Sequence, residues 1–307
     1  MIFTVTLNPA LDYILKVDNL RFDDISRAKY ANIYYGGKGI NVSVVLTRLG
    51  METTAMGFLG GFTGKKLEEM LVNDHINCDF THISGGDTRI NVKIKADCEI
   101  DINASGPNVS KEEINTLLKK IECINSGDCL VLSGSIPASM PEDIYENILS
   151  RLHSKGIRFV VDTTDEMLKN SLKYNPFLIK PNHHELGDLF GVKIKSDEDI
   201  VKYAKELQKL GAENVLVSCA SEGAILVSSD GICRKIKNAD GTLVNSVGCG
   251  DSMVAGFIAG YIEKGDFSYA LQLGAACGNA TAFSEELATK EEIEKILSCK
   301  SPITILN

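Results

Sequence analysis

Short apolar runs alternate with helix-period segments along most of the chain. The apolar runs predict strands at 2–7, 54–60, 129–135, 159–162, 177–182 and 214–219. Apolar residues at helical spacing predict helices at 41–49, at 65–72 and from about residue 141. Gly50 follows the first of these helices, where a helix commonly ends. Strands that are apolar on both faces and are separated by helices indicate an α/β fold with a mostly parallel sheet.

Two stretches, 12–35 and 88–104, depart from this pattern because they contain alternating apolar and polar positions. In the second stretch Ile90, Val92 and Ile94 alternate with polar residues, a turn follows near 96–97, and a second alternating run comes next. This pattern predicts a hairpin with one solvent-facing side. We expect both stretches to form a small sheet that projects from the core as a lid. The chain contains no internal repeat, low-complexity tract or long linker.

Composition narrows the class of protein. The 307 residues are 44% hydrophobic with a mean hydropathy of +0.01, which is ordinary for a globular protein. We expect no signal peptide and no membrane segment, because the first residues lack a basic region and no apolar run reaches the roughly 20 residues that a membrane helix needs. The nine cysteines have no CxxC spacing, so we expect no zinc site, reduced thiols and a cytoplasmic location.

Charge makes some partners unfavourable. The 41 acidic and 32 basic residues give a net charge of −9, which argues against general affinity for nucleic acids or anionic membranes. A small anionic substrate would therefore have to be bound by a local cluster of positive groups.

The segment VNSVGCGDSMVAGFIAG at 244–260 combines a glycine turn with a carboxylate at the start of an apolar helix. Free N–H groups at a helix N-terminus favour anions, and glycines let the backbone approach them closely. The turn formed by Gly248, Cys249 and Gly250 could therefore hold a phosphoryl group, with Asp251 as the base for an attacking hydroxyl. Alternatively, Asp251 only stabilises the helix start. A reactive thiol at Cys249 is a further hypothesis, since a helix N-terminus lowers thiol pKa values.

A second glycine-rich turn, YYGGKGINVSVVL at 34–46, also precedes a helix. Lys38 could supply a point charge to a phosphate, and Asn41 could contact sugar hydroxyls. The alternative is a solvated lysine on an ordinary turn. Neither this segment nor 248–253 fits the Walker A or GxGxxG pattern. Asp12 follows a strand end, where α/β sheets bind ligands, although a single aspartate there is usually a turn residue.

Five ordered motifs resemble those of ribokinase-like sugar kinases. They are LNPALD at 7–12, GGKGIN at 36–41, SGSIP at 133–137, KPNHHE at 180–185 and VGCGDS at 247–252. They look most like the phosphofructokinase B branch, which acts on phosphorylated ketohexoses, and the resemblance covers essentially the whole chain. TRINVKI at 88–94 and SGP at 105–107 look most like 1-phosphofructokinases, with tagatose-6-phosphate kinases as close relatives.

The resemblance implies a ribokinase-like, three-layer α/β/α core with a mostly parallel sheet and a small β-sheet lid. We expect the core to comprise 1–11, 36–87 and 105–307, and the lid to comprise 12–35 and 88–104. The relatives also suggest a homodimer in which lid sheets pack together.

The resemblance further implies roles for individual residues. Asp251 would be the catalytic base, and Gly248, Cys249 and Gly250 the anion hole. The sugar phosphate would be bound, together with Asp251, by Asp12, Arg27, Gly37, Lys38, Asn41 and Arg89. The nucleotide would be bound, together with Gly248 and Gly250, by Lys180, Asn182, Ser218, Glu222, Gly223, Asn279 and Phe283. Mg²⁺ would be held by Asn182 and Glu185, through water.

Structural alternatives exist for several of these residues. Arg27 and Arg89 could instead lie on a solvated strand face, and 278–283 could be a small-residue helix that packs on another helix. The neighbouring KPNxxE pattern explains His183 and His184 as helix-surface residues rather than metal ligands.

The function implied is ATP-dependent phosphorylation of fructose 1-phosphate to fructose 1,6-bisphosphate, with Mg²⁺ and a monovalent cation such as K⁺. A tagatose-6-phosphate or fructose-6-phosphate kinase is the alternative enzyme. A non-catalytic sugar-phosphate-binding protein is the alternative from another class. We expect no nucleic-acid or membrane partner.

Overall fold

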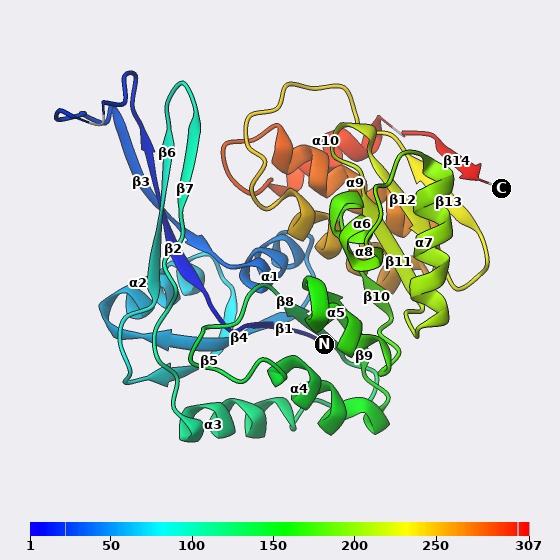
Figure 1. Ribbon diagram of the computed structural model, residues 1–307, viewed down its shortest axis with the longest axis horizontal. Helices are drawn as coiled ribbons and strands as arrows, with labels where there is room; N and C mark the ends of the chain where they lie inside the picture. The colour runs from blue at the N-terminus through cyan, green and yellow to red at the C-terminus, as the bar shows by residue number, and fades with distance from the viewer. Residues whose placement is uncertain (22, 300, 307) are drawn as a thin grey trace.

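The computed structural model describes residues 1–21, 23–299 and 301–306, and its centre is one large sheet (Figure 1). The strand order is β14 (Ile303–Leu306), β13 (Cys233–Ile236), β12 (Ala224–Val227), β11 (Asn214–Ser218), β10 (Leu178–Ile179), β9 (Arg158–Asp162), β8 (Cys129–Ser133), β1 (Ile2–Thr6), β4 (Thr53–Gly60) and β5 (Asn77–Ile83). All neighbours from β5 to β11 are parallel, whereas β12, β13 and β14 pair antiparallel at one edge. The predicted α/β fold is confirmed.

Helices cover both faces of this sheet because alternate strand residues point to opposite sides. Cys129 and Val131 of β8 pack in the cluster that includes α1 (Lys38–Arg48), α8 (Cys249–Lys264), α9 (Phe267–Ala282) and α10 (Lys290–Ser298). Leu130 and Leu132 face α3 (Lys111–Ile121) and α4 (Ile144–Leu152) on the other side. The helices α5 (Asp165–Leu172), α6 (His183–Phe190) and α7 (Asp197–Lys209) continue that second layer, whereas α2 (Gly61–Asn73) packs with α1.

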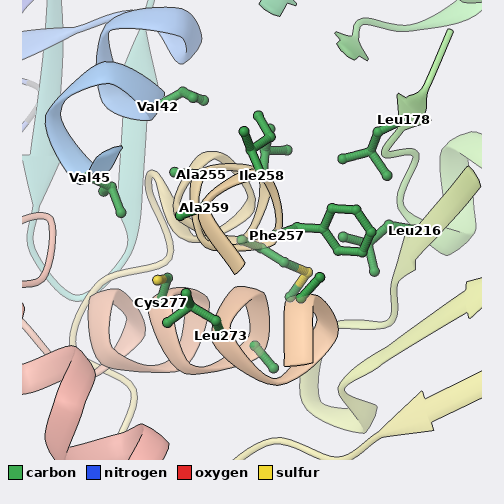
Figure 2. Packing of buried hydrophobic residues seen from close by; sticks show 14 of the residues in the cluster. Val42, Val45, Leu178, Leu216, Ala255, Phe257, Ile258, Ala259, Leu273 and Cys277 are labelled. Carbon is green, nitrogen blue, oxygen red and sulfur yellow. The ribbon is translucent and has the colours of Figure 1, made fainter. Parts of the chain in front are cut away.

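Helix α8 lies inside the core, and Figure 2 shows it between α1 and α9. From Asp251 to Gly260 every residue of α8 is buried, which fits the continuous apolar run of the sequence. Gly256 lets α9 approach closely, because a Cβ atom at this position would lie 2.6 Å from Cys277 Sγ and 2.6 Å from the carbonyl oxygen of Leu273. The middle of α8 therefore packs closely against α9.

A second sheet carries the strands expected in the lid. Its order is β3 (Tyr30–Gly36), β2 (Ala10–Lys16), β6 (Arg89–Lys95) and β7 (Glu99–Ile102), and it projects from the core in Figure 1. The antiparallel pairing of β6 with β7 confirms the predicted hairpin.

The two sides of the lid differ in polarity and in exposure. Asn91 and Lys93 are buried, whereas Ile33, Ile90 and Ile102 are 41–56% exposed. The hairpin has one solvent-facing side, as expected, and this side is the apolar one. The reason is that the polar side turns toward the core and lines a cavity there.

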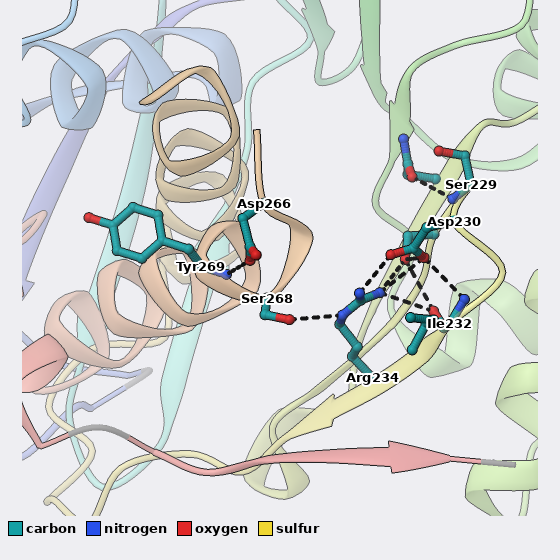
Figure 3. A network of polar contacts seen from close by, with 9 residues as sticks. Ser229, Asp230, Ile232, Arg234, Asp266, Ser268 and Tyr269 are labelled. Carbon is teal, nitrogen blue, oxygen red and sulfur yellow. Dashed lines mark hydrogen bonds and ion pairs between the residues drawn. The ribbon is translucent and has the colours of Figure 1, made fainter. Parts of the chain in front are cut away.

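A polar network around Arg234 of β13 connects the antiparallel edge of the main sheet to α9 (Figure 3). The guanidinium is nearly buried and donates to Asp230 Oδ2 at 2.6 Å, to Ser228 Oγ at 2.7 Å and to Ser268 Oγ of α9 at 3.0 Å. These bonds join the β12–β13 turn to α9.

Among the helices that the structure describes, none is long and apolar enough to cross a membrane.

Candidate active site

Two glycine turns meet where α1 and α8 begin. Gly37, with φ +124°, precedes α1, and Gly248, with φ +80°, precedes α8, so both residues adopt a conformation that favours glycine. Asn41 of α1 donates from Nδ2 to Asp251 Oδ2 of α8 at 2.8 Å. The structure thus brings the two glycine motifs together at the carboxyl ends of the parallel strands, the edge at which open α/β sheets bind ligands.

Asp251 lies buried in the first turn of α8 and has an unusual pKa. Burial, followed by the nearby charge of Asp162, raises its pKa to about 6, even though the Asn41 hydrogen bond, Lys38 and Lys180 act in the opposite direction. A carboxylate with a pKa near 6 is ionised at neutral pH and still basic enough to accept a proton from a hydroxyl. Its position and its pKa both suit a general base.

Asp162, at the end of β9, is a candidate site residue that the sequence did not lead us to expect. It is buried, and Lys38 Nζ and Lys180 Nζ each lie 3.4 Å from one of its carboxylate oxygens. Burial alone would raise the pKa of Asp162, but Lys180 and then Lys38 outweigh it and keep this pKa below its ordinary value. The available signal was an aspartate at the carboxyl end of a predicted parallel strand, FVVD at 159–162.

Lys38 and Lys180 supply positive charge beside the 248–250 glycine turn. Lys180 Nζ would lie 3.1 Å from a Cβ atom on Gly250, so the absence of a side chain there lets the ammonium approach the turn. Burial tends to lower the pKa of Lys38, but Asp162, Asp251 and Glu185 together raise it, so this lysine is charged. The SGSIP motif is also close, since a Cβ atom on Gly134 would lie 3.7 Å from Lys38 Cβ.

Asp12 lies at the root of the lid, where three neighbours fix its carboxylate. Asn91 Nδ2 donates to Oδ1 at 2.9 Å, and Lys93 Nζ lies 3.5 Å from Oδ2. A Cβ atom on Gly36 would lie 2.8 Å from the carboxylate. Lys93 was not singled out from sequence, although it stands in the TRINVKI block that also contains Arg89.

The two arginines predicted to contact the sugar phosphate lie in different surroundings. Arg89 donates to the backbone carbonyl oxygens of Ala104 at 3.0 Å and Asn8 at 2.9 Å, so part of its fork joins the lid to neighbouring loops. Arg27 is exposed in the connection between β2 and β3, which forms the free end of the lid in Figure 1. The structure does not bring Arg27 to the group around Asp251.

A cavity of about 90 Å³ lies between the lid and the core. Asp12 and Asn41 line it next to the glycine turns, and Lys93 and Lys95 line it from the lid. Its core side is formed by Asn245, Ser246, Val247, Glu285, Glu286 and Leu287. The cavity could therefore receive a small polar molecule that reaches Asn41, the hydrogen-bond partner of Asp251.

Asn182 and Glu185 form a capping box at the start of α6. Asn182 Oδ1 accepts from the backbone N–H groups of His184 and Glu185, and Glu185 Oε2 accepts from the N–H of Asn182 at 2.7 Å. Within the described residues no cluster of three or more His, Cys, Asp or Glu side chains could hold a metal by itself. One carboxylate with a free oxygen nevertheless fits a Mg²⁺ ion that keeps its waters and is carried by nucleotide phosphates.

The remaining nucleotide candidates lie around β11, β13 and α9. Ser218 ends β11 and forms a β-bridge with Asn182, and the exposed Glu222 follows it. Gly223, with φ +92°, lies where a Cβ atom would be 2.0 Å from the carbonyl oxygen of Ile236. Asn279 lines a cavity of about 30 Å³ with Ile236 and residues of α10, and the Phe283 ring packs on Gly241.

Cys249 does not have the environment of a reactive thiol. Burial, followed by the charge of Asp251, raises its pKa to about 11, and its thiol donates to the carbonyl oxygen of Asn245 at 3.4 Å. The hypothesis of a thiolate at this helix N-terminus was therefore wrong, because desolvation and a like charge outweigh the helix dipole.

Residues 6–294 match the pfkB family of carbohydrate kinases. The chain belongs to this family. PfkB members among its relatives include the 1-phosphofructokinase of Bacillus subtilis, 45% identical over 297 residues and covering 97% of each chain. The D-tagatose-1-phosphate kinase of Bacillus licheniformis is 37% identical over 300 residues, which cover 97% of this chain and 98% of that protein.

Solved structures of PfkB-like proteins agree with this assignment. Phosphofructokinase-2 from Escherichia coli in complex with fructose-6-phosphate superposes with a TM-score of 0.90 at 28% identity, covering 97% of this chain and 98% of the other. The same enzyme has also been solved in complex with potassium and in a tetrameric inhibited form. The expected ribokinase-like fold with a separate small sheet is thus confirmed, and the chain is a sugar kinase of the PfkB type.

Proposed function

We propose that this PfkB kinase transfers a phosphoryl group from ATP to the free primary hydroxyl of a ketohexose 1-phosphate, with fructose 1-phosphate as the preferred acceptor. The product would be fructose 1,6-bisphosphate. The observation that carries the proposal is the buried Asp251, with its pKa of about 6, in the first turn of α8 beside the 248–250 glycine turn and Lys180. This arrangement joins a base to an anion-binding helix terminus.

In this proposal each part of the site has one task. Asp251 removes the proton from the attacking hydroxyl, and Asn41 orients the Asp251 carboxylate. Asp12, fixed by Asn91 and Lys93, receives sugar hydroxyls. The N–H groups at 248–250 and the ammonium of Lys180 stabilise negative charge on the transferred phosphoryl group. The lid covers the acceptor and keeps out water, which would otherwise compete for that group.

Assignments that rest on the resemblance remain part of the proposal. Lys38 and Arg89 bind the sugar phosphate, and the segments around Ser218, Gly223 and Asn279 bind the nucleotide. Mg²⁺, held through water by Asn182 and Glu185, would neutralise phosphate charge. K⁺ is proposed because the Escherichia coli relative was solved with potassium. A cytoplasmic location belongs to the same proposal.

The relatives support a 1-phosphate acceptor. The Bacillus subtilis and Bacillus licheniformis enzymes are named for fructose and tagatose 1-phosphates, respectively. The alternative acceptor that these names favour is therefore D-tagatose 1-phosphate, in addition to the tagatose 6-phosphate and fructose 6-phosphate expected from the sequence.

The test is ADP release with MgATP and each of these four sugar phosphates. We expect kcat/KM for fructose 1-phosphate to exceed that for either 6-phosphate by at least about a hundredfold. The reason is that buried polar groups placed to bind one phosphate position are left unpaired when the phosphate is at the other position. Asp251→Asn should lose several orders of magnitude of turnover and keep its fold. Binding without ADP release by the unaltered protein would instead favour the non-catalytic sugar-phosphate-binding protein.

The lid offers a surface for a second copy. On the side away from the cavity, one row across the four strands consists of Ile33, Tyr13, Val92 and Ile102. Because Ile33 and Ile102 are exposed, this row would gain from burial. We propose a homodimer in which the two lids pack through this face, with the lid comprising 12–35 and 88–104 and the core the remaining segments.

A further inference from the structure

Arg48, in the last turn of α1, joins parts of the site that lie far apart in the sequence. Its Nη1 donates to the carbonyl oxygen of Leu287 and, at 3.1 Å, to that of Ala288. Its Nη2 donates to the hydroxyl of Tyr35 at 3.3 Å, and this hydroxyl donates to Asp74 Oδ2 at 3.1 Å. One guanidinium thus links the 285–288 segment to strand β3 of the lid.

The 285–288 segment forms a wall of the catalytic turn. A Cβ atom on Gly248 would lie 2.6 Å from Leu287 Cδ2, so the Leu287 side chain packs directly against the glycine that opens the anion hole. Leu287 also lines the cavity under the lid. A shift of this wall would therefore change both the position of the turn and the shape of the cavity.

The other contact of Arg48 reaches the second glycine turn. Tyr35 immediately precedes Gly36 and Gly37, whose turn opens α1 and leads to Lys38 and Asn41. Burial, with Asp74 adding to it, raises the pKa of Tyr35 beyond its ordinary value despite the charge of Arg48, so the hydroxyl stays protonated and can donate to Asp74 while it accepts from Arg48. A planar guanidinium with several donors can satisfy three acceptors in this way, whereas a single ammonium cannot match their geometry.

We propose that Arg48 is a positioning residue for phosphoryl transfer: it holds the 287–288 backbone against the Gly248 turn and couples this wall to the root of the lid. The inference rests on the proposed kinase function and adds a residue that lies outside the glycine turns themselves. Arg48 contacts neither of the carboxylates assigned to base or sugar binding, so its effect on turnover runs through Leu287 and Tyr35.

The test compares Arg48→Ala and Arg48→Lys with Arg151→Ala, a control in which the lost arginine bonds only Glu122 and Asn147 at the surface. We expect Arg48→Ala to lose about a hundredfold in kcat, the scale at which an ångström of misplacement slows a reaction. Guanidinium at about 20 mM, far below the molar concentrations that unfold proteins, should restore part of the kcat of Arg48→Ala. It should not change Arg48→Lys or Arg151→Ala.

Other outcomes would contradict the proposal. If Arg48→Ala lowers the Tm but keeps the kcat of the unaltered protein, or if guanidinium gives no recovery of kcat, the residue is only structural. If Arg48→Ala does not fold, Arg48→Lys and Tyr35→Phe replace it as the test. Both variants should lower kcat/KM for the sugar phosphate. An unchanged kcat/KM in both would overturn the proposal. If the unaltered protein phosphorylates none of the four sugar phosphates, the proposed function is refuted instead.

Discussion

Two buried aspartates that flank the same pair of lysines differ in their acidity. Asp162 has an ammonium 3.4 Å from each oxygen and stays ionised, whereas Asp251 bonds to the neutral amide of Asn41 and has a pKa of about 6. The first is suited to fix charge and the second to exchange a proton. This difference arises from single contacts and sets the pH range in which the site can act.

Turnover should depend on pH through the carboxyl group of Asp251. Because the base must be ionised, kcat/KM should be constant well above pH 6 and fall about tenfold per pH unit below it, following the raised pKa of Asp251. The measurement is the pH profile of kcat/KM for fructose 1-phosphate at saturating MgATP, with the fold checked by circular dichroism at each pH. A plateau that continues to pH 4 in folded protein would exclude Asp251 as the titrating base.

Asn41→Ala should shift the acidic limb of this profile. The amide hydrogen bond lowers the pKa of Asp251, so its loss should raise this pKa and move the acidic limb of the profile upward by about one pH unit. The control is Asn147→Ala, which removes a surface amide bonded to Arg151. An unchanged limb in Asn41→Ala would show that the amide does not tune the base.

At the scale of elements, the network around Arg234 fixes the antiparallel edge of the sheet to α9 (Figure 3). Asp230→Ala would leave a nearly buried guanidinium without its carboxylate, so the free energy of unfolding should fall by about 2–4 kcal/mol. Glu206→Ala, which removes a surface pair with Lys209, should change it by less than about 1 kcal/mol. Urea unfolding of both variants makes the comparison.

The same pair predicts the direction of a pH effect. The Arg234 hydrogen bond lowers the pKa of Asp230 to about 2, below the roughly 3.9 of an unfolded chain. Its contribution to stability is therefore complete above about pH 4 and is lost as the pH falls through 2. Asp230→Ala and the unaltered protein should accordingly converge in stability at the acidic end of that range, and a constant difference would contradict this account.

Most elements were predictable from the sequence, and their bounds shifted for physical reasons. The helix expected at 65–72 begins at Gly61, because loop side chains such as Asp87, which accepts from the N–H of Phe62, complete its first turn. The alternation at 88–104 identified the hairpin but not the direction that its polar side faces. That direction depends on the opposite wall of the cavity, which residues 245–247 and 285–287 form.

For the site, the order of the motifs predicted the family, and the glycine turn at 248–250 predicted Asp251 as the base. The sequence analysis missed Asp162, although its place at the end of a predicted strand was a signal. It missed Lys93 and Arg48 because each acts through a contact with a residue distant in sequence, which the sequence alone does not reveal. Arg27 illustrates the opposite case, since the resemblance implied that it binds the sugar phosphate but the structure leaves it exposed on the lid.

For the whole molecule, the outward apolar face of the lid predicts the assembly. Ile33→Asp should place a charge in the lid–lid contact and convert a particle of about twice 33.3 kDa into one of single-chain mass. Ile305→Asp is the matched control, because Ile305 is also an exposed isoleucine on an edge strand but belongs to the core sheet. Light scattering distinguishes the two results, and a single-chain mass for the unaltered protein would refute the lid dimer.

The central place of α8 also has a consequence for how the chain is made. Roughly two hundred residues separate the end of α1 from the start of α8, so a ribosome adding about 5–20 residues per second needs about 10–40 s to supply the helix that covers Val42 and Val45. During translation the emerging chain therefore displays the apolar surface that Figure 2 shows enclosed. Chaperone capture of nascent chains should end only after α8 and α9 have left the ribosome.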